Sequence, residues 1–416
     1  MKPITKLTTL FIMLLILAAC GDKEEPTPAA SVPPTSPPET AVPETAVEEP
    51  AAESAANGEV KPLPDDVIAQ LDEFLQVQIY SEGTNPQVTA PGIVLLVDTP
   101  DGRYLQAAGV SSMEDGTPML TDDRLEIGSN TKSFTIVLLM QLVEEGVLSL
   151  DDPLSKWLPD QAAALPNGDQ ITLHELAQHT SGIWDYADEV IGDGTTDPEK
   201  LIQGYTPDEL IQYAIDNGTP DFAPGEEGQW KYSNTGYILL GMVIEAASGE
   251  TMGDLYQSRI FDPLGMETAV FLNGVPEDGS ITDGYWWTED GDMVNTTNWN
   301  TTQGWVAGSH AMTAEDLLKY AKALSAGDLF QNPDTLDQML TFDPNGMGGM
   351  LPYGLGLMDL SNTGAPGYWG HEGQTAGFQS LWYTNPDTGM TVIGLSNSAT
   401  FSAFSFANVV PMLSAE

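Results

Sequence analysis

Three short motifs carry residue types that together suit acyl transfer. A Ser-Asn-Thr-Lys run begins at Ser129 and ends at Lys132, and a Tyr-Ser-Asn run spans Tyr232 to Asn234. A His-Glu-Gly run begins at His371, near the C-terminal end of the chain. The three runs supply a nucleophile, candidate bases, an amide that can hold a substrate, and a glycine that opens a strand edge. This combination indicates an enzyme that forms a covalent intermediate on a serine.

Ser129 needs a base beside it, because a serine hydroxyl is a weak nucleophile at its ordinary pKa. The pattern of residues 131–145 predicts a helix, so Lys132 and Ser129, three residues apart, share a face at its first turn. The positive end of the helix favours the alkoxide. Lys132 can accept the proton only if burial or a neighbouring cation lowers its pKa. Taken alone, the motif also fits a helix-capping serine followed by a surface lysine.

The tyrosine motif and His371 supply further proton donors and acceptors. In a cationic pocket, Tyr232 can act as general base and then return the proton to the leaving group. Asn234, two residues on, can donate to a substrate carbonyl. We expect His371 to supply a donor or a proton near Tyr232. Each motif alone also has a structural explanation, as a packed aromatic before a helix or a histidine in a glycine-rich turn.

The residues that follow His371 are expected to hold the substrate. If they form an edge strand, Gly373 lets a substrate backbone approach closely. The backbone N–H groups of Ser129 and Gln374 then form the oxyanion hole. Thr375 offers a hydroxyl on the same side. These residues, with Asn234, are the predicted substrate-binding set.

The sequence favours neither a metal site nor a cofactor. His174 and His179 do not have the spacing of a zinc-binding helix, and no cysteine lies near them. His310 has no obvious partner in the sequence.

The periodicity predicts an α/β fold of the α+β type, with an antiparallel sheet built from both chain ends and flanked by helices. Residues 64–150 and 305–416 are expected to form the α/β part, and 151–304 an inserted, mainly helical subdomain. The aromatic stretch 285–305 is either a lip over the site or padding between loops. The expected strands are 92–97, 104–110, 378–383 and 390–395, and the expected helices are 64–80, 131–145, 172–179, 207–217, 237–247 and 314–326.

The N-terminal sixty residues have a composition of their own. Residues 1–19 combine two lysines with an apolar run, which is typical of a secretory signal, and they end in small residues before Cys20. This junction is similar to a bacterial lipoprotein processing site, which predicts a lipidated Cys20 and an extracytoplasmic, membrane-anchored protein. The remainder of 20–60 is rich in Pro, Glu and Ala and predicts a disordered tether. The alternative is an ordinary signal with a chance cysteine, and nothing identifies which membrane holds the anchor.

The charge of the chain excludes some partners. Thirteen basic and 61 acidic residues give a formal net charge of -48, which repels nucleic acid and anionic membranes. The acids are scattered, as on a solvated surface. Both adaptation to high salt and a generally acidic extracytoplasmic proteome explain them.

At the three motifs the chain resembles the serine β-lactamase and penicillin-binding superfamily, in its class C β-lactamase-like group. That group includes serine D,D-carboxypeptidases, D-aminopeptidases and esterases. The resemblance implies that Ser129 is the acylated nucleophile, Lys132 its partner, Tyr232 the general base and acid, and Asn234 the substrate-binding amide. Further runs agree in the same order along the chain: His-Thr-Ser-Gly at 179–182, Pro-Gly at 224–225, Ala-Gly at 307–308 and Tyr-Gly-Leu-Gly at 353–356.

The substrate is less defined than the chemistry. His371 stands where class C β-lactamases usually have lysine, which resembles the D,D-carboxypeptidase and D-aminopeptidase branch. No Lys or Arg follows Lys322, so a substrate carboxylate lacks an evident cation there. We therefore expect a D-amino-acid peptidase or D,D-carboxypeptidase-like hydrolase acting on a small molecule or peptide, for example one derived from peptidoglycan. An esterase, a weak β-lactamase and a non-catalytic peptidoglycan- or penicillin-binding protein stay open, as does the oligomeric state.

Overall fold

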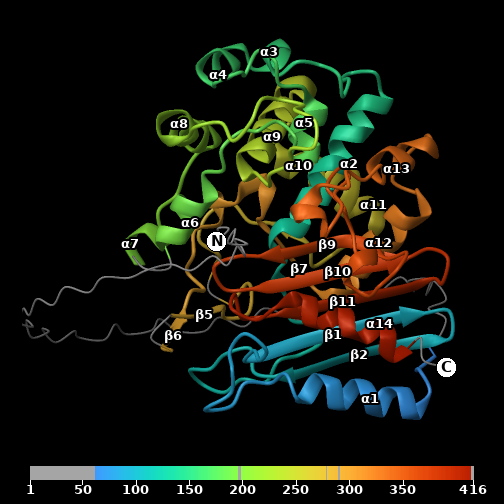
Figure 1. Cartoon of the computed structure of the whole chain (residues 1–416). Coiled ribbons are helices and arrows are strands. Elements are labelled where there is room, and N and C mark those ends of the chain that lie inside the picture. The colour runs from blue at the N-terminus through green and yellow to red at the C-terminus, as the bar shows by residue number, and fades with distance from the viewer. Residues whose placement is uncertain (1–60, 195–197, 278, 289–290, 414–416) are drawn as a thin grey trace, which may run out of the picture. The chain divides into compact units, whose positions relative to one another are not determined.

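Both ends of the chain contribute strands to a six-stranded antiparallel sheet, with the order β2-β1-β11-β10-β9-β8 (Figure 1). Every neighbouring pair in it runs antiparallel, as the sequence predicts. Two short turns, after β1 and after β10, close the β1–β2 and β10–β11 hairpins. The strands are β1 Gly92–Thr99, β2 Gly102–Gly109, β8 Met358–Asp359, β9 Trp369–Gln374, β10 Gln379–Asn385 and β11 Met390–Ser396.

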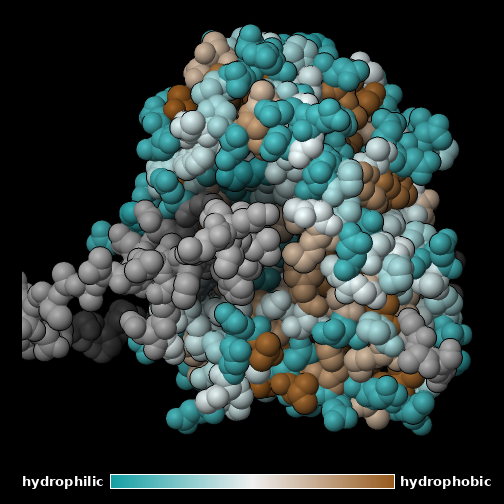
Figure 2. All heavy atoms as spheres, in the orientation of Figure 1, coloured by the Kyte–Doolittle hydropathy of each residue, from teal (hydrophilic) through white to brown (hydrophobic). Residues whose placement is uncertain are grey.

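The computed structural model describes residues 61–194, 198–277, 279–288 and 291–413. They belong to the unit that begins at Gly58. The signal, Cys20 and tether predicted for 1–60 lie outside the described residues. In the part of the chain that is described, no helix is long and apolar enough to cross a membrane. Hydrophilic residues cover most of the visible face of this unit (Figure 2).

Helices cover both faces of the sheet, and each face has its own apolar core. On one face, α2 (Thr131–Glu144) and α12 (Ala314–Ala326) pack over Val94, Trp382 and Ile393. On the other, α1 (Asp65–Gln76) and α14 (Val409–Leu413) pack over residues of the opposite strand parity. The sheet is therefore the middle layer of three.

The helix α2 is buried more completely than its sequence suggests. The pattern of 131–145 predicts one apolar face, but eleven of the fourteen residues of α2 are buried, including Lys132. A helix enclosed on all sides belongs to the interior of a large domain. Lys132 is thereby held away from water at the first turn.

The chain between β3 (Leu125–Glu126) and β7 (His310–Met312) is mainly helical. β3 pairs with β7, and β7 with β4 (Val270–Phe271), in a second, three-stranded sheet. Within the aromatic stretch 285–305, β5 (Tyr285–Trp287) and β6 (Met293–Asn295) form a hairpin, and Trp287 and Trp299 are buried. The helices are α3 Leu154–Trp157, α4 Pro159–Ala164, α5 Leu173–Gln178, α6 Ala187–Gly194, α7 Pro198–Leu201, α8 Pro207–Asn217, α9 Asn234–Ser248, α10 Met252–Tyr256 and α11 Asp262–Leu264, with α13 Asp334–Met339 later in the chain.

Local signals fix the ends of the helices that border the site. A capping box of Thr172 and Glu175 starts α5, and His179, with φ 63°, ends it in the left-handed conformation. A second capping box, of Thr206 and Glu209, starts α8. The end of α5 at His179 determines where the following loop leaves that helix.

Candidate active site

Ser129 lies in a one-turn 3-10 helix directly before α2, held against the edge of β9. The preceding Gly128 has φ 52°, and a Cβ atom there would lie 2.5 Å from the Gln374 nitrogen. Only glycine fits both the left-handed conformation and this close approach. The Ile127 N–H donates to the His310 carbonyl at 2.9 Å, which ties the same segment to β7. Ser129 is thus fixed between two sheets.

Lys132 is the centre of a buried hydrogen-bond network. Its Nζ donates to Ser129 Oγ at 3.0 Å, to Asn234 Oδ1 at 2.7 Å and to the Ala307 carbonyl at 2.8 Å. Burial lowers the pKa of Lys132 to about 7, while the negative charges of Asp185 and Glu372 oppose the shift. Near neutral pH, the neutral amine that can accept a proton from Ser129 is therefore well populated.

Tyr232 presents its ring to Lys132, whose Nζ lies 4.7 Å from the ring centroid. Burial raises the pKa of Tyr232 well above its ordinary value. The nearby Ser129 hydroxyl lowers this pKa, and the charges of Glu372 and Asp185 raise it further. No described residue meets the geometric requirements of a hydrogen bond to the Tyr232 hydroxyl. The surroundings are thus less cationic than the sequence interpretation assumed, and Tyr232 is a neutral phenol at physiological pH.

Asn234 is held by a carboxylate that the sequence reasoning did not identify. The Asn234 backbone N–H donates to Asp185 Oδ1 at 3.0 Å, and its Nδ2 donates to Asp185 Oδ2 at 2.9 Å. These two bonds turn Oδ1 of Asn234 toward Lys132. One N–H of the Asn234 amide is left for a substrate, since an amide nitrogen carries two hydrogens.

His179 clamps the tyrosine motif from both sides of Tyr232. Its carbonyl accepts from the Lys231 N–H at 3.1 Å, and its Nδ1 accepts from the Ser233 N–H at 3.2 Å. The His179 and Tyr232 rings lie 4.3 Å apart between centroids. Burial lowers the pKa of His179, helped by the charge of Lys132, so the ring is neutral and Nδ1 is free to accept.

His371 is fully buried and does not bond to Tyr232, contrary to expectation. Its Nε2 lies 2.9 Å from the Tyr353 hydroxyl, and its Nδ1 pairs with the Glu372 carbonyl. Burial lowers the pKa of His371 to about 3, so Nδ1–H donates to the carbonyl and Nε2 accepts from Tyr353. The Tyr353 ring meets the Tyr232 ring edge-on at 6.3 Å. His371 therefore reaches Tyr232 only through Tyr353.

The strand edge differs from expectation at two positions. A Cβ atom on Gly373 would lie 1.9 Å from the Ile127 carbonyl, so the glycine makes room for the protein's own backbone rather than for a substrate. Thr375 is only 4% exposed, and its hydroxyl accepts from the Gly377 N–H at 3.4 Å. Thr375 also holds down the pKa of buried Glu126, which burial raises to about 8. Its hydroxyl is therefore part of the protein interior.

Gln374 stays a candidate through its backbone alone. Its side-chain Nε2 donates to the Ala399 carbonyl at 2.9 Å, so the amide group is already engaged. The Gln374 nitrogen lies beside Gly128, next to Ser129. β8 pairs with β9 at Trp369 and Gly370, so among the described residues no strand pairs on that side with the end of β9 that carries Gln374.

The titratable side chains also bear on whether the protein holds a metal ion and on what His310 does. Among the described residues, no group of three or more His, Cys, Asp or Glu side chains is suited to a metal ion. His310 lies buried in an aromatic cluster, edge-on to Phe134 and Tyr256, and burial lowers its pKa to about 3. It is a neutral core residue.

Comparisons with known proteins agree with this geometry. A family model described as Beta-lactamase matches residues 65–409. Penicillin-binding protein 4* of Bacillus subtilis (strain 168) is 27% identical over 318 residues, 74% of this chain and 68% of that protein. The D-aminopeptidase of Brucella anthropi is 28% identical over 328 residues, 76% of this chain and 58% of that protein. A solved D-stereospecific amidohydrolase from Streptomyces sp. is similar with a TM-score of 0.70 at 29% identity, over 83% of this chain and 98% of that one.

Proposed function

Because the chain belongs to the beta-lactamase family of serine hydrolases, we propose that it cleaves an amide or ester through an acyl-enzyme on Ser129. The observation that carries the proposal is the contact of Lys132 Nζ with Ser129 Oγ at 3.0 Å in a buried site. A lysine whose pKa burial has lowered is a competent base for a serine hydroxyl.

The roles follow from protonation state and position. Lys132 takes the proton as Ser129 attacks, and the backbone N–H groups of Ser129 and Gln374 receive the developing oxyanion. Tyr232, neutral and adjacent to Lys132, passes the proton to the leaving group. His371 does not hydrogen-bond to Ser129 or Tyr232. It acts by holding the Tyr353 hydroxyl through a hydrogen bond.

We propose a substrate with a D-amino-acid residue and a free amine. Asp185 and Glu372 both act on Lys132. Burial raises the pKa of Glu372 itself to about 7, so this carboxyl is ionised in part at neutral pH, and the field in the site favours an ammonium group over a carboxylate. Lys132 is the basic side chain of the network, burial lowers its pKa, and no Lys or Arg occurs after Lys322. The names of two relatives, a D-aminopeptidase and a D-stereospecific amidohydrolase, support the same class. These features disfavour a D,D-carboxypeptidase or a β-lactamase, whose substrates present a carboxylate.

A matched set of anilides tests this substrate class. D-alanine p-nitroanilide should be hydrolysed at least about tenfold faster, in kcat/KM, than its N-acetyl derivative, since loss of a charge contact costs that much. It should also be hydrolysed faster than the L-enantiomer, which keeps the ammonium group but places it differently. An N-acylated D-alanyl-D-alanine peptide, with its free carboxylate, should be a poor substrate. Preference for that peptide over the free amine would reject this substrate class while leaving the serine hydrolase itself intact.

We propose that Cys20 is lipidated and holds the hydrolase outside the cytoplasm. The support is sequence alone, since the only cysteine follows the small residues that end the apolar segment. In membrane and soluble fractions of bacterial cells that express the full chain, Cys20→Ala should move the protein out of the membrane fraction. Equal membrane retention of Cys20→Ala and the parent protein would contradict lipidation.

His179 is the positioning residue that we expect to matter most. Removing the Nδ1 acceptor in His179→Leu frees Ser233 and lets Tyr232 move, which should lower kcat about 10- to 100-fold with little change in KM. Asparagine tolerates the left-handed conformation and can place an oxygen where Nδ1 was, so His179→Asn should recover most of the loss.

His174→Asn, on the same helix, is the matched control and should retain activity. If His179→Asn and His179→Leu are equally impaired at unchanged melting temperature, the acceptor is not what His179 contributes.

A further inference from the structure

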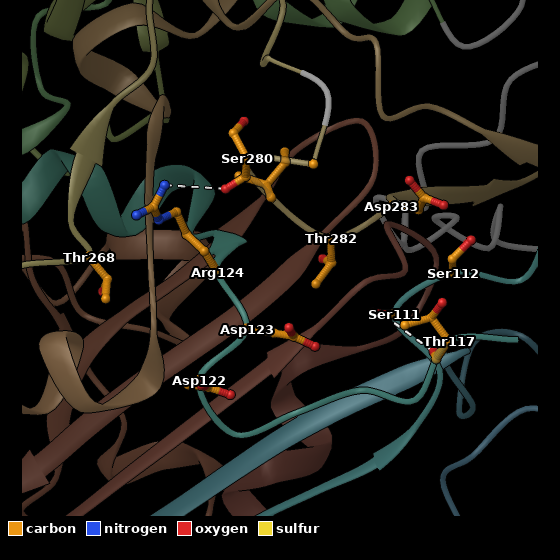
Figure 3. A pocket seen from close by; sticks show the side chains of 12 residues that line it. Ser111, Ser112, Thr117, Asp122, Asp123, Arg124, Thr268, Ser280, Thr282 and Asp283 are labelled. Carbon is orange, nitrogen blue, oxygen red and sulfur yellow. Dashed lines mark hydrogen bonds between the residues drawn. The ribbon is translucent and has the colours of Figure 1, made fainter. Parts of the chain in front are cut away.

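A cavity separate from the network around Ser129 opens where β3 begins. It has a volume of about 480 Å³ and lies between the loop after β2, the residues before β3 and the segment 279–283 (Figure 3). None of Ser129, Lys132, Tyr232, Asn234 and His371 lines it. The volume is within the range of small-molecule sites.

Arg124 is the exceptional residue of this cavity. Of the three arginines, Arg103 pairs with Asp98 and Arg259 pairs with Glu145. Arg124 has no carboxylate partner within the described residues: its Nη1 donates to the Ser280 carbonyl at 3.2 Å, and its buried Nε has no acceptor. In a chain with 61 acidic residues, an unpaired guanidinium facing a cavity is ready for a carboxylate, which it binds through two parallel hydrogen bonds.

Two hydroxyl groups beside Arg124 also lack partners. Thr282 is only 6% exposed, and neither its Oγ1 nor the buried Oγ of Ser280 has a hydrogen-bond partner in the described part of the chain. Figure 3 shows Thr282 between Arg124 and Asp283. Buried polar atoms are nearly always satisfied, so three orphaned atoms on residues that line one cavity point to a polar ligand beside them.

Three carboxylates in the wall of the cavity carry charge opposite to that of Arg124. Asp122, Asp123 and Asp283 line the cavity with Arg124. Burial raises the pKa of Asp123 and the charge of Asp122 raises it further, while a hydrogen bond from the Leu120 N–H opposes the shift. A ligand with an anionic group alone would meet this field unfavourably, whereas an ammonium group would relieve it.

We propose that this cavity binds a free α-amino acid. The ligand carboxylate lies on the Arg124 guanidinium, the ammonium group faces the aspartates, and the hydroxyls of Ser280 and Thr282 complete the hydrogen bonds. The site is distinct from the catalytic one, so the inference does not depend on the proposed hydrolysis.

Calorimetric titration of the full-length Ser129→Ala chain tests this site without turnover. L-alanine or D-alanine should bind saturably. Acetate and ethylammonium, which each carry only one of the two charged groups of alanine, should not bind at the same concentrations. Arg124→Gln should weaken alanine binding at least about tenfold, the usual cost of losing a charged hydrogen bond. Arg259→Gln, which removes an arginine that is already paired, should leave binding unchanged.

Thr282→Val provides a second variant that keeps the backbone bond from Thr282 N–H to the Arg124 carbonyl. It should weaken binding severalfold while the melting temperature stays close to that of the parent. Absence of saturable binding by both alanines, equal binding of acetate, or full binding in folded Arg124→Gln would overturn the proposal. The last result would place the amino acid in the catalytic site.

Discussion

Replacing Ser129 by alanine should lower turnover of any substrate by about 10⁴-fold or more, because no other group can form the acyl-enzyme. Lys132 would then have no hydroxyl to deprotonate, although its bonds to Asn234 and to the Ala307 carbonyl remain. The folded state should be retained, since Ser129 is only partly buried. Steady-state kinetics with labelling by a fluorophosphonate probe provide the measurement.

Ser133→Ala is the matched control for this prediction. Ser133 lies in the same helix, and its hydroxyl donates to the Asn130 carbonyl at 2.8 Å, away from Lys132. Its loss should leave probe labelling unchanged. Undiminished labelling of Ser129→Ala would remove Ser129 from the nucleophile's role.

The rate should also depend on the protonation of Lys132. Burial lowers the pKa of this amine to about 7, so kcat/KM should rise with pH as the amine loses its proton and should level off above that value. Well below pH 7 the rate should fall about tenfold for each pH unit, because only the neutral amine is a base. Above pH 7, Lys132→Met should lose about 10²- to 10⁴-fold in kcat relative to the parent enzyme, and its rate should no longer follow this pKa.

Two further variants test whether the midpoint of the pH profile reports the pKa of Lys132. Asp185→Asn removes a negative charge that raises the pKa of Lys132, so the midpoint of the profile should move to lower pH. Lys156→Met, a change at an exposed lysine paired with Asp152, should alter neither rate nor midpoint. A wild-type rate that does not change across neutral pH would exclude Lys132 as the base.

Much of the architecture could be read from local patterns. The helix predicted at 207–217 is α8 as observed, because Pro207 and the capping box of Thr206 and Glu209 define its start without help from distant residues. The β1–β2 and β10–β11 hairpins, which lie toward opposite ends of the chain, have alternation and turn residues that depend only on neighbours in sequence. Signals of this kind are local, and they carried the prediction of the fold.

The parts that were wrong or missed depend on contacts between distant residues. A side chain at Gly373 would collide with the Ile127 carbonyl, so only glycine fits there. The ring of His371 is already hydrogen-bonded to the Tyr353 hydroxyl. The clamp by His179 joins residues 54 positions apart, and the two bonds from Asn234 to Asp185 span 49. No periodicity or spacing encodes such pairs. The His-Thr-Ser-Gly run was visible in the sequence, but its role was not.

The most direct test of the central claim is the mass of the intact full-length protein, quenched during turnover of D-alanine p-nitrophenyl ester. We predict an increase equal to one alanyl group, located on the peptide that contains Ser129, which disappears as product forms and is absent in Ser129→Ala. Release of product with no adduct on that peptide, or an adduct of the same mass in Ser129→Ala, would contradict the acyl-enzyme mechanism.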